Sequence, residues 1–377
     1  MRYSSYLHAS VLVAVAVFCA HSCMAANQKI TQAQIEKSLK TNPESYAVRL
    51  QAGKYFEEIG FAGEAQEQYL AATKCKDARA EAFNRLAQMY LQDRQYTKAR
   101  SAADLAVKRF PDSYGAHLTS GYIYHNQNDF DRALAEYKKA QTIEPKNPQI
   151  YIALGDATMG DGDNKGALAY LQKARQLGPE TNLWRYQMGM VHKNLKEWDK
   201  ARDFFEKNFD QDPFNRQSNL AYVNMLSDSK NPKKDPVKAL EVSFCLIATA
   251  QGNEMFQLKV RLKTLIAELR PSQVESAKND AIARITNTKL KARMLFCLGD
   301  VFDQLNLPDW GIKSYRAGLA FNPDFARGHL RLGIDLEGYG KDKQGALREY
   351  ETALKLDAKD KETQARLQNL KRELKIK

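Results

Sequence analysis

The sequence predicts an all-α protein in which antiparallel helix pairs stack into a solenoid. The first observation is a 34-residue period, because small and large residues recur in register through six consecutive copies that begin at Tyr46. The second is a polar break, such as Gln92-Asp93-Arg94, that divides each copy into two segments with helical spacing. A single helix pair cannot bury its apolar faces, so such an array is stabilised by stacking neighbouring pairs.

The clearest copy of the repeat runs from Tyr114 to Asn147, and its numbering from 1 to 34 defines the positions used below. Small Gly121 (position 8) and Ala133 (position 20) are expected where the two helices come closest. Large residues at positions 4, 7, 11 and 24 fill the space beside that contact. Proline at position 32 has no amide hydrogen and disfavours helix in the residue before it, so it ends the second helix. This proline recurs as Pro111, Pro145, Pro179, Pro213 and Pro323.

In this register the chain resembles the tetratricopeptide repeat (TPR) family. The resemblance implies a right-handed superhelix of antiparallel helix hairpins, with a concave groove that binds proteins or peptides. One subclass of the family binds C-terminal carboxylates through a clamp of lysine, asparagine and arginine. That clamp is absent, because Leu50, Arg85 and Thr119 stand at positions where it needs other residues.

The register also predicts how the chain is organised. We expect a signal peptide over residues 1–25, a capping helix over 26–45, and six repeats over 46–251. The sixth repeat carries an insertion near 229–236. Residues 252–291 lack the small residues of positions 8 and 20, so we expect a degenerate helical hairpin there. Two further repeats over 292–360 and a charged capping helix over 361–377 complete the chain.

The N-terminal segment has the pattern of a secretory signal. Arg2 precedes an apolar run from Ala9 to Ala20, and small residues occupy the −3 and −1 places before Ala26. We therefore expect cleavage after Ala25 and export to a periplasm or out of the cell. The apolar run is shorter than the roughly 20 residues that a spanning helix needs, although retention as an anchor stays an alternative.

The residue types indicate binding rather than catalysis. The sequence contains no phosphate-binding loop, hydrolase elbow or zinc-protease motif. His117, His192 and His329 occupy packing positions of their repeats. After the signal segment the cysteines are odd in number and far apart, which fits neither a disulfide framework nor a metal motif. We expect no catalytic, cofactor or metal site.

The predicted binding surface lies on the first helix of each repeat. In a TPR superhelix, positions 2, 5, 9, 12 and 13 of that helix face the groove. Its middle is apolar and aromatic with amides nearby, and such surfaces mark interaction sites. The alternative is that these residues contact the facing helices or a neighbouring copy of the chain. The predicted partner-binding residues are Leu118, Tyr122, His125, Asn126, Ile152, Met159, Tyr186, Met190 and Asn194.

Positive charge is concentrated in one part of the chain. The formal net charge is +12, and residues 229–293 hold 13 Lys or Arg against 6 Asp or Glu. An anionic envelope surface could bind there, and a solvated basic face is the alternative. Nucleic acid is not expected, because no aromatic-interleaved motif accompanies the charge. The residues chosen for the anionic contact are Lys233, Lys234, Lys259 and Arg261.

Together these features predict an exported, non-catalytic scaffold that binds a protein or peptide in its groove. Two alternatives stay open at this point. The array could be a structural subunit of an envelope-assembly or secretion complex, with self-association into a homo-oligomer. It could also be an accessory subunit of an enzyme.

Overall fold

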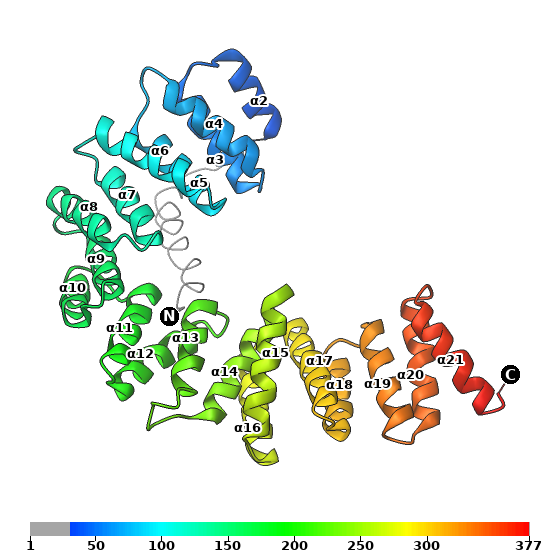
Figure 1. The fold of residues 1–377 in the computed structure, drawn as a ribbon. Helices are drawn as coiled ribbons and strands as arrows, with labels where there is room; N and C mark the ends of the chain where they lie inside the picture. The colour runs from blue at the N-terminus through cyan, green and yellow to red at the C-terminus, as the bar shows by residue number, and fades with distance from the viewer. Residues whose placement is uncertain (1–30, 377) are drawn as a thin grey trace. The chain divides into compact units, whose positions relative to one another are not determined.

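The computed structural model describes residues 31–376, and every regular element in that range is an α-helix (Figure 1). The predicted all-α solenoid is confirmed, because successive helices form antiparallel pairs that stack on one another. The signal peptide predicted over residues 1–25 lies outside the described residues. The chain divides into two compact units, one ending at Leu195 and one beginning at Lys196.

The first unit contains a short leading helix and the helices of the first repeats. Each first helix and its second helix match the two halves of a 34-residue period. The helices are α2 (Gln32–Thr41), α3 (Tyr46–Glu58), α4 (Ala62–Lys74), α5 (Ala80–Gln92), α6 (Tyr96–Arg109), α7 (Tyr114–Asn126), α8 (Phe130–Ile143), α9 (Pro148–Gly160), α10 (Asn164–Leu177) and α11 (Asn182–Asn194).

The second unit continues with α12 (Trp198–Gln211), α13 (Arg216–Leu226), α14 (Pro236–Thr249), α15 (Gly252–Ala267), α16 (Pro271–Arg284), α17 (Thr288–Gln304), α18 (Pro308–Phe321), α19 (Ala326–Gly338), α20 (Lys343–Leu356) and α21 (Lys361–Glu373). Two details differ from expectation. Helix α17 begins at Thr288, before the repeat start expected at 292. Helices α15 and α16 both lie against α14, and their backbones approach each other less than those of a regular pair. Lys259 stands at position 8 of α15, where a regular repeat has a small residue, and its side chain pairs with Asp300 of α17.

Local residue chemistry sets where the first helices begin and where each pair turns. In five places from α3 to α13 the residue just before a first helix caps it, because its side-chain oxygen accepts a hydrogen bond from a backbone amide of the first turn. Arg79 before α5 and Phe325 before α19 make no such bond. The caps are Ser45, Ser113, Asn147, Thr181 and Asn215. The residue at position 15 adopts a left-handed backbone conformation that reverses the chain, at Gly60, Arg94, Asn128, Gly162, Lys196 and Asn306.

Four of the helix pairs are held together where a ring of the second helix lies on a glycine of the first, and in a fifth Leu171 covers Gly155. A Cβ atom built on Gly121 would stand 2.5 Å from the ring of Tyr137 and 3.1 Å from the carbonyl oxygen of Ala133. Gly53 meets Tyr69, Gly299 meets Tyr315 and Gly333 meets Tyr350 in the same way. The small residue at position 8 is therefore required mainly by the large side chain at position 24.

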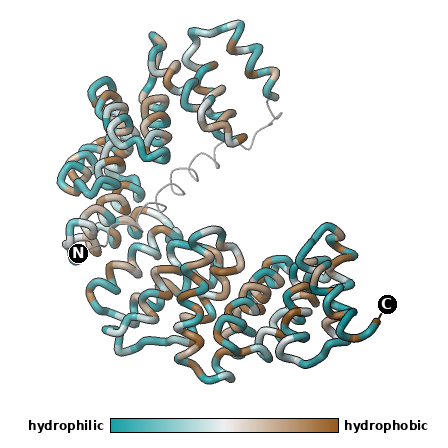
Figure 2. The backbone as a smooth tube through the Cα atoms, turned by 45° about the vertical axis from the view of Figure 1, so that its right-hand side comes forward, coloured by the Kyte–Doolittle hydropathy of each residue, from teal (hydrophilic) through white to brown (hydrophobic). Residues whose placement is uncertain are grey.

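In the first unit the first helices form one continuous layer. Helix α7 contacts both α5 and α9, and α9 contacts α11, whereas the second helices α4, α6, α8 and α10 show no comparable contact with one another within residues 31–195. Apolar residues are spread over every helix pair rather than gathered in one central core (Figure 2). The layer of first helices is the more closely packed one, which makes it the inner face of this unit.

The glycine contact yields a direct test. Gly121→Ala should lower the free energy of unfolding by about 1–3 kcal/mol, because the new methyl group overlaps the Tyr137 ring. Chemical denaturation of the purified chain measures the change. Gly63→Ala in α4 is the matched control, since a Cβ there meets no atom within 4 Å. Equal stability of the two variants would contradict the packing argument.

Candidate functional site

The polar residues at position 4 of the first helices bind the turn that joins each repeat to the one before it, called the joint below. Each of five such side chains lies within hydrogen-bond distance of the carbonyl oxygen of a proline six residues earlier, in the turn that closes the preceding repeat. Four residue types perform this same task, so the requirement is for a donor of suitable reach rather than for a particular residue. The pairs are Arg49 with Pro43, His117 with Pro111, Tyr151 with Pro145 and His329 with Pro323 at 2.8 Å, and Asn219 with Pro213 at 2.9 Å.

Two of these residues are the histidines His117 and His329, and both ring nitrogens of each are engaged. The Nδ1 atom of His117 lies 2.6 Å from Glu136 Oε2, and that of His329 lies 2.6 Å from Glu349 Oε2. The hydrogen bond to Glu349 raises the pKa of His329, with burial opposing it. Each histidine thus joins the preceding turn to the second helix of its own repeat.

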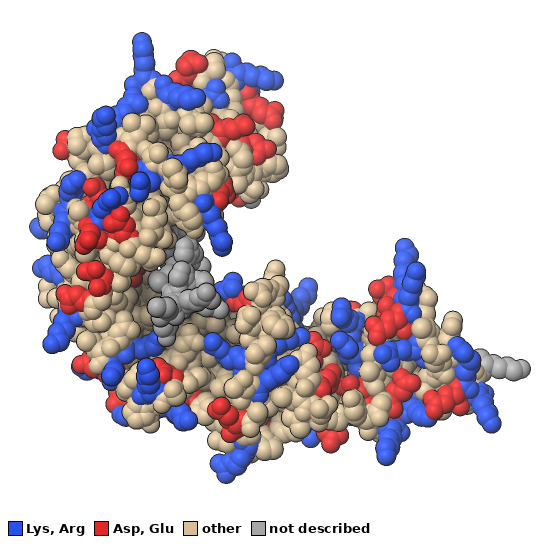
Figure 3. Space-filling view, in the orientation of Figure 1, with Lys and Arg blue, Asp and Glu red and all other residues tan. Residues whose placement is uncertain are grey.

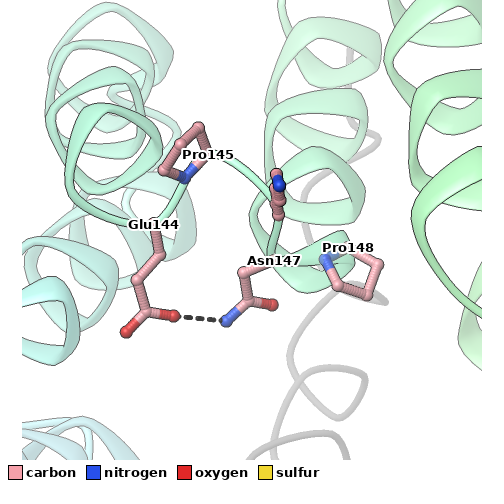
Figure 4. Close-up of a pocket in the computed structure, with 5 residues that line it drawn as sticks. Glu144, Pro145, Asn147 and Pro148 are labelled. Atoms are coloured by element: carbon pink, nitrogen blue, oxygen red, sulfur yellow. Dashed lines mark hydrogen bonds between the residues drawn. The ribbon is translucent and has the colours of Figure 1, made fainter.

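A shallow depression at the α8–α9 turn belongs to this same joint (Figure 4). It is lined by residues 144–148. The Asn147 side chain donates to Glu144 Oε2 at 2.8 Å and its oxygen caps α9 at Gln149. Tyr151 donates to the carbonyl of Pro145. These side chains close a repeat, and they do not converge on a common point as ligand-binding groups would.

The predicted partner-binding residues of the first unit lie on α7, α9 and α11, the inner layer. Tyr122 and Ile152 are each only 8% exposed, so contacts within the protein cover most of their surface. Leu118, Met159 and Met190 are half-buried. The surface is therefore apolar as expected, with its side chains in partial contact with neighbouring helices.

The amides of this surface already have partners. Asn126 donates to the carbonyl of Tyr122 at 2.8 Å, and Asn194 donates to Asn164 Oδ1 at 2.9 Å. Tyr186 is half-buried and interacts with other residues. The amides therefore support the inner layer, and a partner would have to displace these bonds to use them.

One ionisable pair stands on the inner layer. His125 Nε2 lies 3.8 Å from Asp156 Oδ2, and the His125 ring contacts Phe130 edge-on with centroids 5.4 Å apart. Burial raises the pKa of Asp156, while His125 lowers it. The pair couples α7 to α9 across the repeat joint and places one carboxyl group within an otherwise apolar surface.

The second unit carries a more exposed apolar surface that the sequence analysis missed. Phe256 and Val260 on α15 are 62% and 45% exposed. Counting α15 from Gly252, they fall at positions 5 and 9, which face the groove in a regular repeat. The opposite face of the helix buries Leu258, Leu262, Leu265 and Ile266. The signal in the sequence was a helix with apolar residues on two faces, but its register could not be assigned without the small residues.

The basic residues proposed for an anionic surface are partly neutralised within the protein. Lys233 pairs with Asp199, and Lys259 lies 2.6 Å from Asp300. Arg284 bridges Asp210 and Glu241 in the same region. Acidic and basic side chains alternate over the face shown in Figure 3 rather than forming a continuous basic field. Ion pairs thus neutralise part of the surplus charge of this segment.

Residues 31–376 contain no group of three or more His, Cys, Asp or Glu side chains placed to hold a metal ion, and no helix among them is long and apolar enough to cross a membrane. Cys75, Cys245 and Cys297 are free thiols. Burial raises the pKa of Cys245 to about 12, which keeps this thiol protonated and unreactive.

The stacked helix pairs, the glycine contacts and the exposed apolar positions define an α-solenoid of the protein-interaction class. Family models for tetratricopeptide repeats match residues 50–114 and 121–162. These two segments of the chain are therefore tetratricopeptide repeats.

Curated relatives share this repeat type at low identity. The BBSome complex member BBS4 of Bos taurus is 25% identical over 309 residues, which cover 81% of this chain and 53% of that protein. A TPR repeat-containing protein of Methanocaldococcus jannaschii is 24% identical over 310 residues, 77% of this chain and 53% of that protein. The chain spans about half the length of these relatives.

A solved structure of PilW, described as a type IV pilus biogenesis factor, aligns with a TM-score of 0.44 and 21% identity, covering 50% of this chain and 88% of that one. At this similarity the alignment carries no argument about function.

The joint at His329 predicts a pH effect on stability. The pKa of His329 is raised in the folded state. Its contribution to the free energy of unfolding is therefore complete below its pKa in the unfolded chain, about 6.5, and is lost as the pH rises through its pKa in the folded protein. His329→Asn should reduce the loss of stability between pH 5.5 and pH 8.5, because asparagine does not titrate in this range. It also keeps the donor that Asn219 uses at the same position. Chemical denaturation at both pH values measures this, and an unchanged pH dependence would contradict it.

Proposed function

We propose that this protein is an exported scaffold that binds partner proteins through the inner-layer surfaces of its first helices. The observation that carries the proposal is the exposure of Phe256 and Val260 at groove-facing positions of α15. Large apolar side chains exposed together mark interaction sites more often than they occur by accident. The predicted signal segment over residues 1–25 supports the exported location.

The irregular pair α15–α16 is the favoured contact site in the second unit. Regular repeats use their apolar residues for stacking, whereas α15 both packs against α14 and α17 and keeps an apolar face outside. In the first unit, Tyr186 and Met190 extend the inner apolar surface on α11. A structural subunit in a larger envelope complex is the alternative role, and it uses the same surfaces for permanent contacts.

Site-specific crosslinking in the native cells tests the binding surface. A photo-reactive amino acid at position 256 should yield covalent adducts with another protein, identified by mass spectrometry. The matched control is position 105, because Leu105 on the second helix α6 is 50% exposed but lies outside the inner layer. Equal yields at positions 256 and 105 would refute a preferred role for α15.

Substitution should then weaken the contact without unfolding the chain. The double variant Phe256→Ser with Val260→Ser should reduce recovery of the crosslinked partner by about tenfold or more, as loss of a central apolar anchor does. Its thermal stability should change little, since both side chains face solvent. Undiminished recovery from the folded variant would place binding elsewhere.

The exported location and the oligomeric state have separate readouts. Intact mass of the mature protein should correspond to a chain that starts at Ala26.

Light scattering after size-exclusion chromatography should give a monomer if the partner is another protein. A stable homo-oligomer whose assembly depends on Phe256 would instead support the structural alternative.

A further inference from the structure

An acidic residue occupies a core position of the last repeat. Position 10 of the first helix packs inside the solenoid, and Asp335 stands there, 3% exposed. A carboxylate in such a place costs stability unless it is neutralised. In the other repeats this position holds Tyr55, Met89, Ile123, Ala157, Val191, Met225 and Val301.

A second departure from the repeat pattern lies next to the first. Position 20 is alanine in six repeats and glycine at Gly311 in α18. A Cβ on Gly311 would overlap Asp303 Oδ1 of α17 and stand 3.1 Å from Asp335 Oδ2 of α19. The glycine therefore makes room for two carboxyl groups that meet at the joint between repeats. The alanines are Ala65, Ala99, Ala133, Ala167, Ala201 and Ala346.

The two carboxyl oxygens that meet there, Asp303 Oδ1 and Asp335 Oδ2, are buried, and among the described residues neither finds a donor. The carboxyl groups lie within hydrogen-bonding reach of one another. Two carboxylates cannot share such a position, whereas a carboxylic acid facing a carboxylate forms a hydrogen bond. One proton held between Asp335 and Asp303 therefore satisfies both oxygens.

The groups around the pair favour Asp335 as the residue that carries the proton. The Tyr315 hydroxyl of α18 lies 2.8 Å from Asp303 Oδ2 and 2.8 Å from Asp300 Oδ1, and its one proton is shared between the two oxygens. This hydrogen bond lowers the pKa of Asp303 and so favours its carboxylate form. Lys259 of α15 lies 2.6 Å from Asp300, and Arg331 of α19 lies 3.9 Å from it.

Helix α14, which packs on α17, pairs its Lys238 and Glu241 with Glu206 and Arg284. Helix α20, which packs on α19, also directs its polar groups elsewhere. Its Glu349 binds His329, and its Tyr350 donates to Glu337 at 2.6 Å. Burial, followed by the charge of Asp303, raises the pKa of Asp335 to about 7, against a weaker lowering by Arg331.

We propose that Asp303 and Asp335 form a proton-binding pair that couples docking of the C-terminal repeat, α19–α21, onto α17 and α18 to pH. The folded state holds a proton that the unfolded segment releases above about pH 4. Docking is therefore strongest at acidic pH and weakens as the pH rises towards neutrality, where loss of the proton leaves two like charges in the joint. Opening of this joint exposes the apolar side chains that meet there, Phe296, Leu319 and Leu330.

Hydrogen exchange of the full-length chain between pH 5 and pH 8 tests the proposal. After correction for the intrinsic exchange rate, the opening constant of α19–α21 amides should rise with pH, by at most about tenfold per pH unit for one released proton. His329→Asn serves as the background, because it removes the other titrating group of this repeat. Amides of α5 and α6 in the first unit, which contain no histidine, provide the internal reference.

Three variants distinguish the effect of the proton on the opening constant from the effect of side-chain packing. Asp335→Asn imitates the protonated acid and should make the opening constant independent of pH, with docking as strong as in the parent at pH 5. Asp335→Val, the residue type of position 301, should also remove the pH dependence. Asp309→Asn is the control, since Asp309 is exposed at the start of α18 and should leave the dependence intact.

Two outcomes would overturn the proposal. One is an opening constant in the parent that does not change between pH 5 and pH 8, or one whose change survives in Asp335→Asn. The other is stabilisation of α19–α21 at pH 8 by millimolar Mg²⁺ or Ca²⁺ that Asp335→Asn abolishes, which would identify a cation site in place of a shared proton.

Discussion

The contact between a glycine and a ring determines how closely the two helices of a repeat approach. Where Tyr137 covers Gly121, no side chain separates the ring from the backbone of the first helix. The same contact recurs in the first repeat and in the last two. Because packed interiors tolerate neither voids nor overlaps, this single spacing fixes the geometry of the pair, and stacking propagates it to the next pair.

The joints between pairs depend on a second recurring interaction, the hydrogen bond from position 4 to the carbonyl of the closing proline. Proline ends the second helix but leaves its carbonyl oxygen without a helical donor. Arg49, His117 and Asn219 reach that oxygen with different side chains. Residues that resemble catalytic or ligand-binding groups in the sequence are thus occupied by the requirement to satisfy buried backbone.

Both proposed functional features lie where the repeat pattern fails. Helix α15 lacks the small residues that would bring it against α16, and it presents Phe256 and Val260 to solvent. The last joint replaces an apolar residue by Asp335 and an alanine by Gly311. Departures of this kind cost stability, and natural proteins retain them mainly where binding or switching requires them.

The sequence by itself determined the fold class, because a 34-residue period with glycine, large side chains and proline in register leaves one way to bury the apolar faces. It also located the inner-layer residues of the first unit, such as Tyr122 and Ile152. Only the tertiary structure decided how exposed they are, that Asn126 and Asn194 already have partners, and that Lys259 is paired with Asp300. It alone brought Asp303 and Asp335 together. The physical reason is that periodicity reports which face of a helix is buried, whereas ion pairs, exposure and shared protons depend on side chains that meet from helices distant in the chain.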